Sequence, residues 1–231
     1  MISILTPTLN EEKNIPLFIK ELKKLKFNYE LIFIDDNSTD NTEEVVKKFL
    51  SKKIKFIKRK SKNRDLSQSI ILGVKNAKYN YVLVLDCDLQ HNVASANNMY
   101  KKIIKDNFDI VIGSRFLKEK YSGNLGYVRS LFSVAFIFLI NFFLEKKTSD
   151  PLSGYFICKK DIIVKYKKNF FNKGYKILFD IIYNGKKNLN IFDIQILFEK
   201  RIYGKSKLNF KIVNLFIKQF FYTFFLRLKK N

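Results

Sequence analysis

Tyr81-Val-Leu-Val-Leu-Asp-Cys-Asp-Leu-Gln90 is the stretch of this sequence from which a fold can be inferred. Residues 82–85 form a short, continuous apolar run of the kind expected in a buried parallel strand. In an extended chain, side chains two residues apart point the same way, so Asp86, Asp88 and Gln90 are expected to converge. Their oxygens are ligands suited to Mg2+ or Mn2+, at the edge where open α/β sheets bind ligands. The alternative is an acidic turn that caps the next helix.

Strand-like and helix-like segments alternate through the first half of the chain. The alternation predicts an α/β fold with a mostly parallel sheet and helices on both faces. Asp40 and Glu43 have the spacing of a capping box at the start of one of these helices. The apolar pattern predicts strands at residues 2–6, 30–35, 54–58, 81–85 and 109–113, and helices at residues 12–25, 42–50, 66–76 and 94–105.

The second half of the chain has a different pattern. Apolar helices are expected at residues 128–144, 175–183 and 207–228, a turn and strand at 150–156, and a strand at 191–198. No linker rich in Pro, Gly or Ser interrupts residues 1–231, which are therefore expected to form a single domain. The longest uncharged apolar run is shorter than the roughly 20 residues that span a bilayer, so no transmembrane helix is expected.

The charge balance is strongly basic. Lys and Arg number 44 against 21 Asp and Glu, which gives a formal net charge of +23. Such a surplus implies an anionic partner, which could be nucleic acid, a membrane surface or a phosphorylated substrate. A hydrophobic fraction of 47% excludes a largely disordered chain. Two cysteines are too few for a disulfide framework and a strand follows Met1 directly, so we expect a cytoplasmic protein without a signal peptide.

Further polar and charged residues follow other predicted strands. Asp35 and Asp36 end the second strand, where carboxylates could accept hydrogen bonds from a ribose or a base. Arg115 follows the fifth strand, where a guanidinium could donate two parallel hydrogen bonds to a diphosphate. Asp150 lies in a turn constrained by proline, and residues 198–207 combine four cations with a glycine. Nucleic-acid binders also carry such basic segments, but this one follows the pattern of a nucleotide-binding sheet.

In this order, the motifs resemble those of the polyprenyl-phosphate sugar transferases of glycosyltransferase family 2, and most of all those of dolichol-phosphate mannose synthases. The resemblance extends from residue 4 to about residue 210. It rests on Pro-x-x-Asn-Glu at 7–11, Asp-Asp-x-Ser-x-Asp at 35–40, Asp-x-Asp-x-Gln-His at 86–91, Gly-Ser-Arg at 113–115, Asp-Pro-x-Ser-Gly-Tyr-Phe at 150–156 and Arg-x-x-Gly-x-Ser-Lys at 201–207.

The resemblance implies an A-type glycosyltransferase fold and a metal-dependent, inverting enzyme. The enzyme would transfer a hexose, mannose from GDP-mannose, to a polyprenyl or dolichyl phosphate, with Mg2+ or Mn2+ as cofactor. The resemblance implies a nucleoside pocket of Pro7, Leu9, Glu11, Ile34 and Asp36, and metal ligands Asp86, Asp88 and Gln90 with the Cys87 backbone close by. It implies that the phosphates are bound by Arg115, Lys176, Arg201 and Lys207, and that the lipid phosphate is contacted by Arg129 and Ser133. The catalytic residues that it implies are Asp88, Arg115 and Arg201.

The chemistry that the resemblance implies needs no strong protein base. A lipid phosphate is already anionic near neutral pH, so its oxygen can attack the anomeric carbon directly. Metal and arginines would stabilise the charge that develops on the leaving nucleoside diphosphate. His91, the single histidine, is expected to position other groups rather than to transfer a proton.

Several positions depart from the family's pattern. Asn92 and Val93 stand where the family usually has two prolines, Leu9 replaces an aromatic residue, and residues 64–68 replace a Gly-Leu-Gly-like stretch. The sugar and the nucleotide therefore stay open, and UDP-glucose or another donor, or a saccharide acceptor, is the alternative. A basic module that binds nucleic acid is a different class, but it would have no use for an acidic cluster that repels phosphate when empty. We expect no nucleic-acid partner.

The helices expected at residues 128–144 and 207–228 have two interpretations. Both could be core helices. The second, however, carries many Phe residues beside several cations, which suits a helix that lies in the lipid headgroup region. Because the implied acceptor is a lipid, we expect a peripheral protein on the cytoplasmic face of the membrane. Many relatives add transmembrane segments after this point, so either a surface-only attachment or a separate membrane-spanning subunit is implied.

Overall fold

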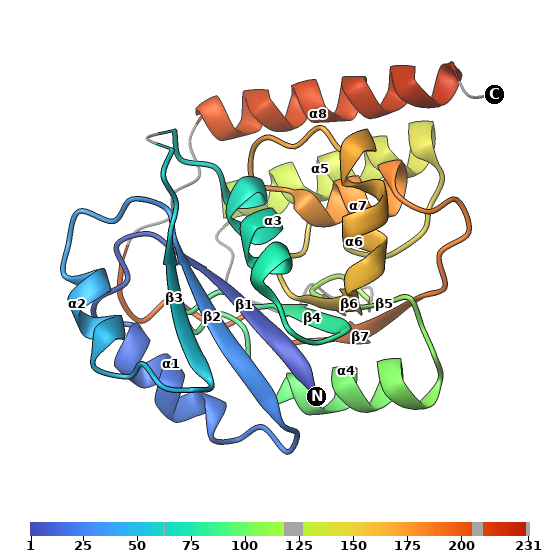
Figure 1. Ribbon diagram of the computed structural model, residues 1–231. Coiled ribbons are helices and arrows are strands. Elements are labelled where there is room, and N and C mark those ends of the chain that lie inside the picture. The colour runs from blue at the N-terminus through green and yellow to red at the C-terminus, as the bar shows by residue number, and fades with distance from the viewer. Residues whose placement is uncertain (62, 118–126, 205–209, 230–231) are drawn as a thin grey trace.

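One sheet lies at the centre of the computed structural model, which describes residues 1–61, 63–117, 127–204 and 210–229, without the side chains of residues 127–129. Within these ranges the sheet has seven strands in the order β3-β2-β1-β4-β6-β5-β7 (Figure 1). The strands are β1 (Ile2–Thr8), β2 (Tyr29–Asp35), β3 (Ile54–Lys58), β4 (Tyr81–Val84), β5 (Ile110–Ser114), β6 (Phe156–Lys159) and β7 (Ile191–Gln195).

The sheet is mostly parallel, as the sequence predicted. β6 alone among the described strands is antiparallel to its neighbours, β4 and β5. Residues 150–156 were expected to hold a turn and a strand, whereas β6 begins only at Phe156. Phe156, Ile157 and Cys158 are fully buried because β6 has a partner on each side. This inserted strand separates β4 from β5 and so places their carboxyl-terminal loops on either side of residues 150–155.

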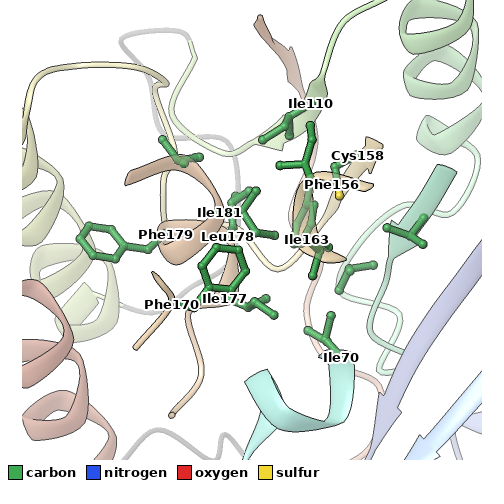
Figure 2. Close-up of a cluster of buried hydrophobic side chains, with 14 of the residues drawn as sticks. Ile70, Ile110, Phe156, Cys158, Ile163, Phe170, Ile177, Leu178, Phe179 and Ile181 are labelled. Carbon is green, nitrogen blue, oxygen red and sulfur yellow. The ribbon is translucent and has the colours of Figure 1, made fainter. Parts of the chain in front are cut away.

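Helices cover both faces of the sheet, as expected (Figure 1). On one face lie α1 (Ile15–Leu22), α2 (Thr42–Lys47) and α4 (Ser95–Lys105), whose apolar residues join one buried cluster. The other face carries a second cluster, seen around Leu178 and Ile163 in Figure 2. It is formed by α3 (Leu66–Asn76), α5 (Tyr127–Leu144), α6 (Lys160–Tyr166), α7 (Ile177–Asn184) and α8 (Phe210–Leu228). The 3-10 turn η1 (Lys167–Asn169) follows α6 and has no buried residue.

Two local expectations need correction. The capping box at α2 is not formed: Asp40 accepts a hydrogen bond from the backbone N–H of Thr42, at 3.0 Å, but Glu43 forms ion pairs with two lysines. The backbone N–H of Asn41 donates instead to Glu12, which lies in the loop after β1. The short helix α6 and the turn η1 were not expected at all. Their seven and three residues are too short for a helical apolar period to stand out.

The outer helices α5 and α8 have both features that the sequence suggested, a face packed into the core and an exposed aromatic face. One face of α8 packs into the core, where Phe216 meets Phe136 and Phe179 with ring centroids 4.8 and 5.4 Å apart. Other rings face solvent: Phe142 on α5 is 72% exposed and Phe225 on α8 is 56% exposed. Of the helices within the described ranges, not one has the length and apolar character to cross a bilayer.

Candidate functional site

The loop after β4 brings the three expected metal ligands to one cavity. Asp86, Asp88 and Gln90 all line it, and Asp88 and Gln90 are buried. The convergence of these side chains was predicted for an extended chain, but the chain is not extended here. It turns after β4, and Leu89 adopts a positive φ of 61°. The backbone N–H of Gln90 donates to Asp88 Oδ1 at 3.1 Å, so the turn, and not strand alternation, makes these side chains converge.

The cavity lies at the carboxyl ends of the parallel strands and gathers most of the expected site residues. Ile34 does not line it, because its side chain is fully buried against Gly73 of α3. Ser133 is half-buried on α5 and does not line it either. The side chain of Arg129 and all of Lys207 lie outside the described residues. The expected residues that line the cavity are Pro7, Leu9, Glu11, Asp36, Asp86, Cys87, Asp88, Gln90, Arg115, Lys176 and Arg201.

Arg201 reaches the acidic loop from far along the chain. Its Nη2 donates to Asp88 Oδ2 at 2.6 Å and to Gln90 Oε1 at 3.1 Å. Backbone pairing holds the two segments together: the N–H of Glu199 donates to the carbonyl oxygen of Gln90 at 2.7 Å, and Phe198 forms an antiparallel bridge with His91. The guanidinium therefore contacts two of the three expected metal ligands.

These contacts also bear on whether the residues suit a metal. Asp86, Asp88 and Gln90 supply hard oxygen donors of the kind that Mg2+ and Mn2+ prefer. A guanidinium already bound to Asp88 and Gln90 shows that these two oxygens attract a cation. No group of three or more His, Cys, Asp or Glu side chains with metal-binding geometry occurs within the described ranges, so the amide oxygen of Gln90 would complete the set. In type and position, the donors fit a divalent ion on a diphosphate.

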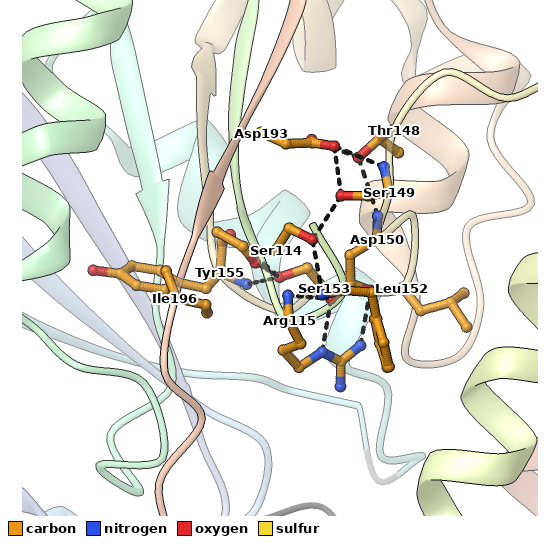
Figure 3. A network of polar contacts seen from close by, with 12 residues as sticks. Ser114, Arg115, Thr148, Ser149, Asp150, Leu152, Ser153, Tyr155, Asp193 and Ile196 are labelled. Atoms are coloured by element: carbon orange, nitrogen blue, oxygen red, sulfur yellow. Dashed lines mark hydrogen bonds and ion pairs between the residues drawn. The ribbon is translucent and has the colours of Figure 1, made fainter. Parts of the chain in front are cut away.

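Arg115 is placed in the cavity wall by a buried carboxylate (Figure 3). Its Nε donates to Asp150 Oδ2 at 2.7 Å and its Nη2 to Asp150 Oδ1 at 2.8 Å, and the Asp150 side chain is fully buried. We had expected this pair of parallel hydrogen bonds to go to a diphosphate. The turn at 150–156 instead supplies their acceptor, and Thr148 Oγ1 accepts the backbone N–H of Asp150. Asp150 thus fixes the orientation of the arginine.

Asp36 is held by an arginine that sequence reasoning missed. Arg59 Nη1 donates to Asp36 Oδ1, and the backbone N–H of Asp65 donates to Asp36 Oδ2 at 2.7 Å. Both side chains of the ion pair are buried. The parallel register of β2 and β3 pairs Asp35 with Lys58, so the next residues, Asp36 and Arg59, leave the sheet side by side. Both strands had been predicted, so their parallel alignment was the signal that could have revealed the pair of Asp36 and Arg59.

Hydrogen bonds join the loops after β1 and β2 beside the cavity. Asn10, with a positive φ of 56°, accepts the backbone N–H of Thr39 on its side-chain oxygen at 2.8 Å. The backbone N–H of Glu11 donates to Thr42 Oγ1 at 2.8 Å, and Glu11 Oε2 accepts from Asn14 at 2.6 Å. Asp35 is occupied in this turn as the acceptor of Ser38. Asp35 does not line the cavity, so Asp36 is the member of this acidic pair that does.

Lys176 and His91 also line the cavity. Lys176 Nζ donates to the carbonyl oxygen of Leu152 at 2.8 Å, and its own carbonyl oxygen accepts from Gln219 of α8 at 3.1 Å. His91 packs between Tyr155 and Phe198, each with a centroid distance of 5.0 Å. Burial lowers the pKa of His91 to about 4, so its ring is uncharged at neutral pH.

Comparison with known proteins identifies relatives in sequence. A family model described as glycosyl transferase family 2 matches residues 3–167. A dolichol-phosphate mannosyltransferase of Pyrococcus furiosus is 34% identical over 184 residues, which cover 78% of this chain and 51% of the relative. A chondroitin synthase of Escherichia coli is 35% identical over 117 residues, which cover 49% of this chain and 17% of that protein. The chain thus spans about half the length of the mannosyltransferase.

Solved structures with the same arrangement of strands and helices identify the fold. Glucosyl-3-phosphoglycerate synthase from Mycobacterium tuberculosis, in complex with Mn2+, UDP-glucose and phosphoglyceric acid, matches with a TM-score of 0.73 at 17% identity, over 98% of this chain and 79% of that one. TarS 1–349 of S. aureus matches with a TM-score of 0.61 at 19% identity, over 84% and 57%. These likenesses confirm the A-type glycosyltransferase fold. The family match over residues 3–167 and the 34% identity to the mannosyltransferase show that this chain belongs to glycosyl transferase family 2.

Proposed function

We propose that this glycosyltransferase moves a hexose, mannose from GDP-mannose, to a polyprenyl phosphate with inversion at the anomeric carbon. The observation that carries the proposal is the grouping of Asp86, Asp88, Gln90, Lys176 and Arg201 around one cavity at the carboxyl ends of the strands. Oxygen donors for a divalent ion lie there beside cations for phosphate groups. The similarity to a dolichol-phosphate mannosyltransferase supports mannose and a lipid phosphate as donor sugar and acceptor.

The residues of the cavity would have different roles in such a transfer. Asp36, fixed by Arg59, accepts hydrogen bonds from the nucleoside, while Asp86, Asp88 and Gln90 would hold a Mg2+ or Mn2+ ion that acts as a Lewis acid for the leaving diphosphate. The lipid phosphate supplies the attacking oxygen and the diphosphate departs from the opposite face of the sugar, which inverts the anomeric centre. Uncharged His91 lacks the imidazolium proton that a general acid would donate at neutral pH, in keeping with a positioning role.

Lys176 and Arg115, together with Arg201, supply the positive charge that this reaction needs. Negative charge grows on the leaving diphosphate as the bond to the anomeric carbon breaks. Cations that are already oriented in a cavity stabilise that charge without rearrangement. Lys176 is oriented by the carbonyl of Leu152, and Arg115 is oriented by Asp150. Both therefore enter the reaction with their positions set.

A nucleotide binding experiment tests the proposed donor. In thermal unfolding with Mn2+, GDP is expected to stabilise the chain more than UDP does. At about 100 times the dissociation constant, a ligand adds roughly 2.7 kcal/mol to the free energy of unfolding. For a chain of this size, that corresponds to a rise in Tm of roughly 5–10 °C. The same titration in EDTA is the control, and the shift should shrink when the ion is removed.

Transfer with labelled donors completes this test. GDP-mannose is expected to label a polyprenyl phosphate faster than UDP-glucose does. A clear preference for UDP and UDP-glucose would reassign the donor, and transfer to a saccharide in place of the lipid would reassign the acceptor. If neither nucleotide shifts the Tm and neither donor is used, the proposed function is wrong.

We further propose that the chain works peripherally, on the cytoplasmic face of a membrane. The support is an apolar surface on the two outer helices, here called the α5–α8 patch: Phe138, Phe142, Phe143, Phe221 and Phe225, all exposed. Phe138 stacks on Phe142, and Phe143 meets Phe224 of α8 at 5.7 Å, so the rings form a continuous surface across both helices. With a net charge of +23, such a surface suits anionic lipid.

Vesicle binding tests this surface. The protein is expected to sediment with anionic vesicles and to loosen only partly in high salt. Each nearby basic residue contributes on the order of 1 kcal/mol, which salt screens, whereas apolar burial is not screened. Removing α8 would be a poor test, because Phe216 and Phe220 are buried in the core. The triple variant Phe138→Gln, Phe142→Gln and Phe225→Gln is expected to lose most of the salt-resistant binding.

A matched control lies on the opposite face of the sheet. Ile104 on α4 is 45% exposed, and Ile104→Gln removes an exposed apolar side chain outside the α5–α8 patch. This variant should bind vesicles as the unmodified chain does. If the triple variant also keeps its salt-resistant binding, the α5–α8 patch is not the membrane contact.

A further inference from the structure

We propose that Arg201 is the resident cation of the metal site and competes with the divalent ion until a nucleoside diphosphate draws it away. The inference rests on the proposed function, because it assigns Asp88 and Gln90 to metal binding. It adds a second role for Arg201, which would set the order in which metal and nucleotide bind. Ion and diphosphate would then bind cooperatively, each weakly alone and tightly together.

The contacts of Arg201 carry this proposal. A single nitrogen, Nη2, lies 2.6 Å from Asp88 Oδ2 and 3.1 Å from Gln90 Oε1. The arginine side chain is 19% exposed and that of Asp88 is 8% exposed, so water screens the pair only weakly. A divalent ion bound to the same two oxygens would lie within a few ångströms of the guanidinium. Two cations that close repel one another, so the ion and the guanidinium cannot both keep these contacts.

The backbone around Arg201 indicates how it could leave. Two hydrogen bonds fix the segment before it. The backbone N–H of Glu199 donates to the carbonyl oxygen of Gln90 at 2.7 Å, and Gln90 Nε2 donates to the carbonyl oxygen of Glu199 at 3.2 Å. After it comes Gly204, whose positive φ of 87° is a conformation that other residues rarely adopt. Arg201 already lines the cavity, so rotation about its side-chain bonds would carry the guanidinium from Asp88 into the cavity while the backbone at residue 199 stays paired.

A diphosphate offers the guanidinium a better partner than the carboxylate that it leaves. The planar fork of arginine matches two phosphate oxygens, and a diphosphate carries more negative charge than a single carboxylate. Once the guanidinium is on the phosphate, Asp88 and Gln90 are released to the ion, which binds the same diphosphate. The coupling is reciprocal, so the ion must raise nucleotide affinity by the factor by which nucleotide raises ion affinity.

Mn2+ binding measured by electron paramagnetic resonance tests this competition without a catalytic assay. The unmodified chain, Arg201→Met and Lys200→Met are titrated with Mn2+ alone, with Mn2+ plus GDP and with Mn2+ plus UDP. Lys200 is the exposed neighbour, so its variant matches the change in net charge. Arg201→Met is expected to bind Mn2+ alone about tenfold more tightly than the unmodified chain does, and to gain less from nucleotide. Lys200→Met should behave as the unmodified chain.

Arg201→Lys separates charge from hydrogen-bond geometry. It keeps the positive charge, so Mn2+ alone should bind it nearly as weakly as it binds the unmodified chain. If Mn2+ binds in the presence of nucleotide but Arg201→Met shows no gain for Mn2+ alone, or if Lys200→Met gains as much, the competition is disproved and the proposed function stands. If no arm binds Mn2+, the proposed metal site fails and this inference fails with it. Circular dichroism of each variant confirms that it is folded.

Discussion

Asp88→Asn is expected to lower sugar transfer by at least about 100-fold while leaving the fold intact. The substitution keeps the shape of the side chain but removes a negative charge from the expected metal ligands. Loss of a group that merely supports a metal ligand typically costs 10- to 100-fold, so loss of a ligand's charge should cost no less. The steady-state transfer rate and Mn2+ binding should fall together, because both depend on the same oxygen.

Asp106→Asn is the matched control for this variant. Asp106 follows α4 and pairs with Lys102 at 2.6 Å; both side chains are about one-third exposed, and neither lines the cavity. Transfer should be unchanged in this control. Full activity of Asp88→Asn, or undiminished activity of the unmodified chain in EDTA, would contradict the metal role.

The parallel half of the fold could be predicted because its signals are local. β2 and β4 contain continuous apolar runs at residues 31–34 and 81–84, and a strand with neighbours on both sides is buried along most of its length. The helix at Leu66–Asn76 and the strand at Ile54–Lys58 were predicted at the bounds that the structure has. In these segments the period, the length and the flanking polar residues all favour the same element.

The antiparallel strand and the pairings of the site depend on contacts that no local pattern encodes. β6 has four residues, too few for a periodicity to indicate which strands it joins. Arg201 and Asp88 are separated by 113 positions in the sequence, and Arg115 and Asp150 by 35. The residue types and their loop positions could be predicted, but not which charge meets which. For this reason the pairing of Arg115 with Asp150 could not be predicted.

Three aspartates in or beside the cavity are each paired with an arginine. Asp36, Asp88 and Asp150 each lie against an arginine, namely Arg59, Arg201 and Arg115. A buried carboxylate without a partner would be costly, and a cavity lined by bare carboxylates would repel a nucleotide. The arginines remove that repulsion where a phosphate must bind. Two of the pairs are deeply buried and fix geometry, whereas Arg201 is the more exposed arginine of the three.

Asp150→Ala is expected to lower the free energy of unfolding by about 3–5 kcal/mol. Removing one partner of a buried ion pair leaves an uncompensated charge, and that cost is larger than the net value of the intact pair. Here the charge left behind belongs to Arg115, which is 6% exposed and loses both hydrogen bonds of its fork. Chemical denaturation monitored by circular dichroism measures the change. Transfer should fall as well, because Arg115 loses the partner that orients it in the cavity wall.

Two further variants decide whether the buried charge is the cause. Asp106→Ala breaks an exposed pair with Lys102 and should cost no more than about 1 kcal/mol. The double variant Arg115→Met, Asp150→Leu removes both charges and fills the space with apolar groups, so it should be more stable than Asp150→Ala. It should nevertheless stay impaired in transfer, since no guanidinium remains at that wall. If Asp150→Ala costs no more than Asp106→Ala, the ion pair does not anchor the turn at 150–156, and the orientation of Arg115 must be set by the aromatic rings of Phe116 and Phe198, at 5.2 and 5.7 Å from its guanidinium carbon.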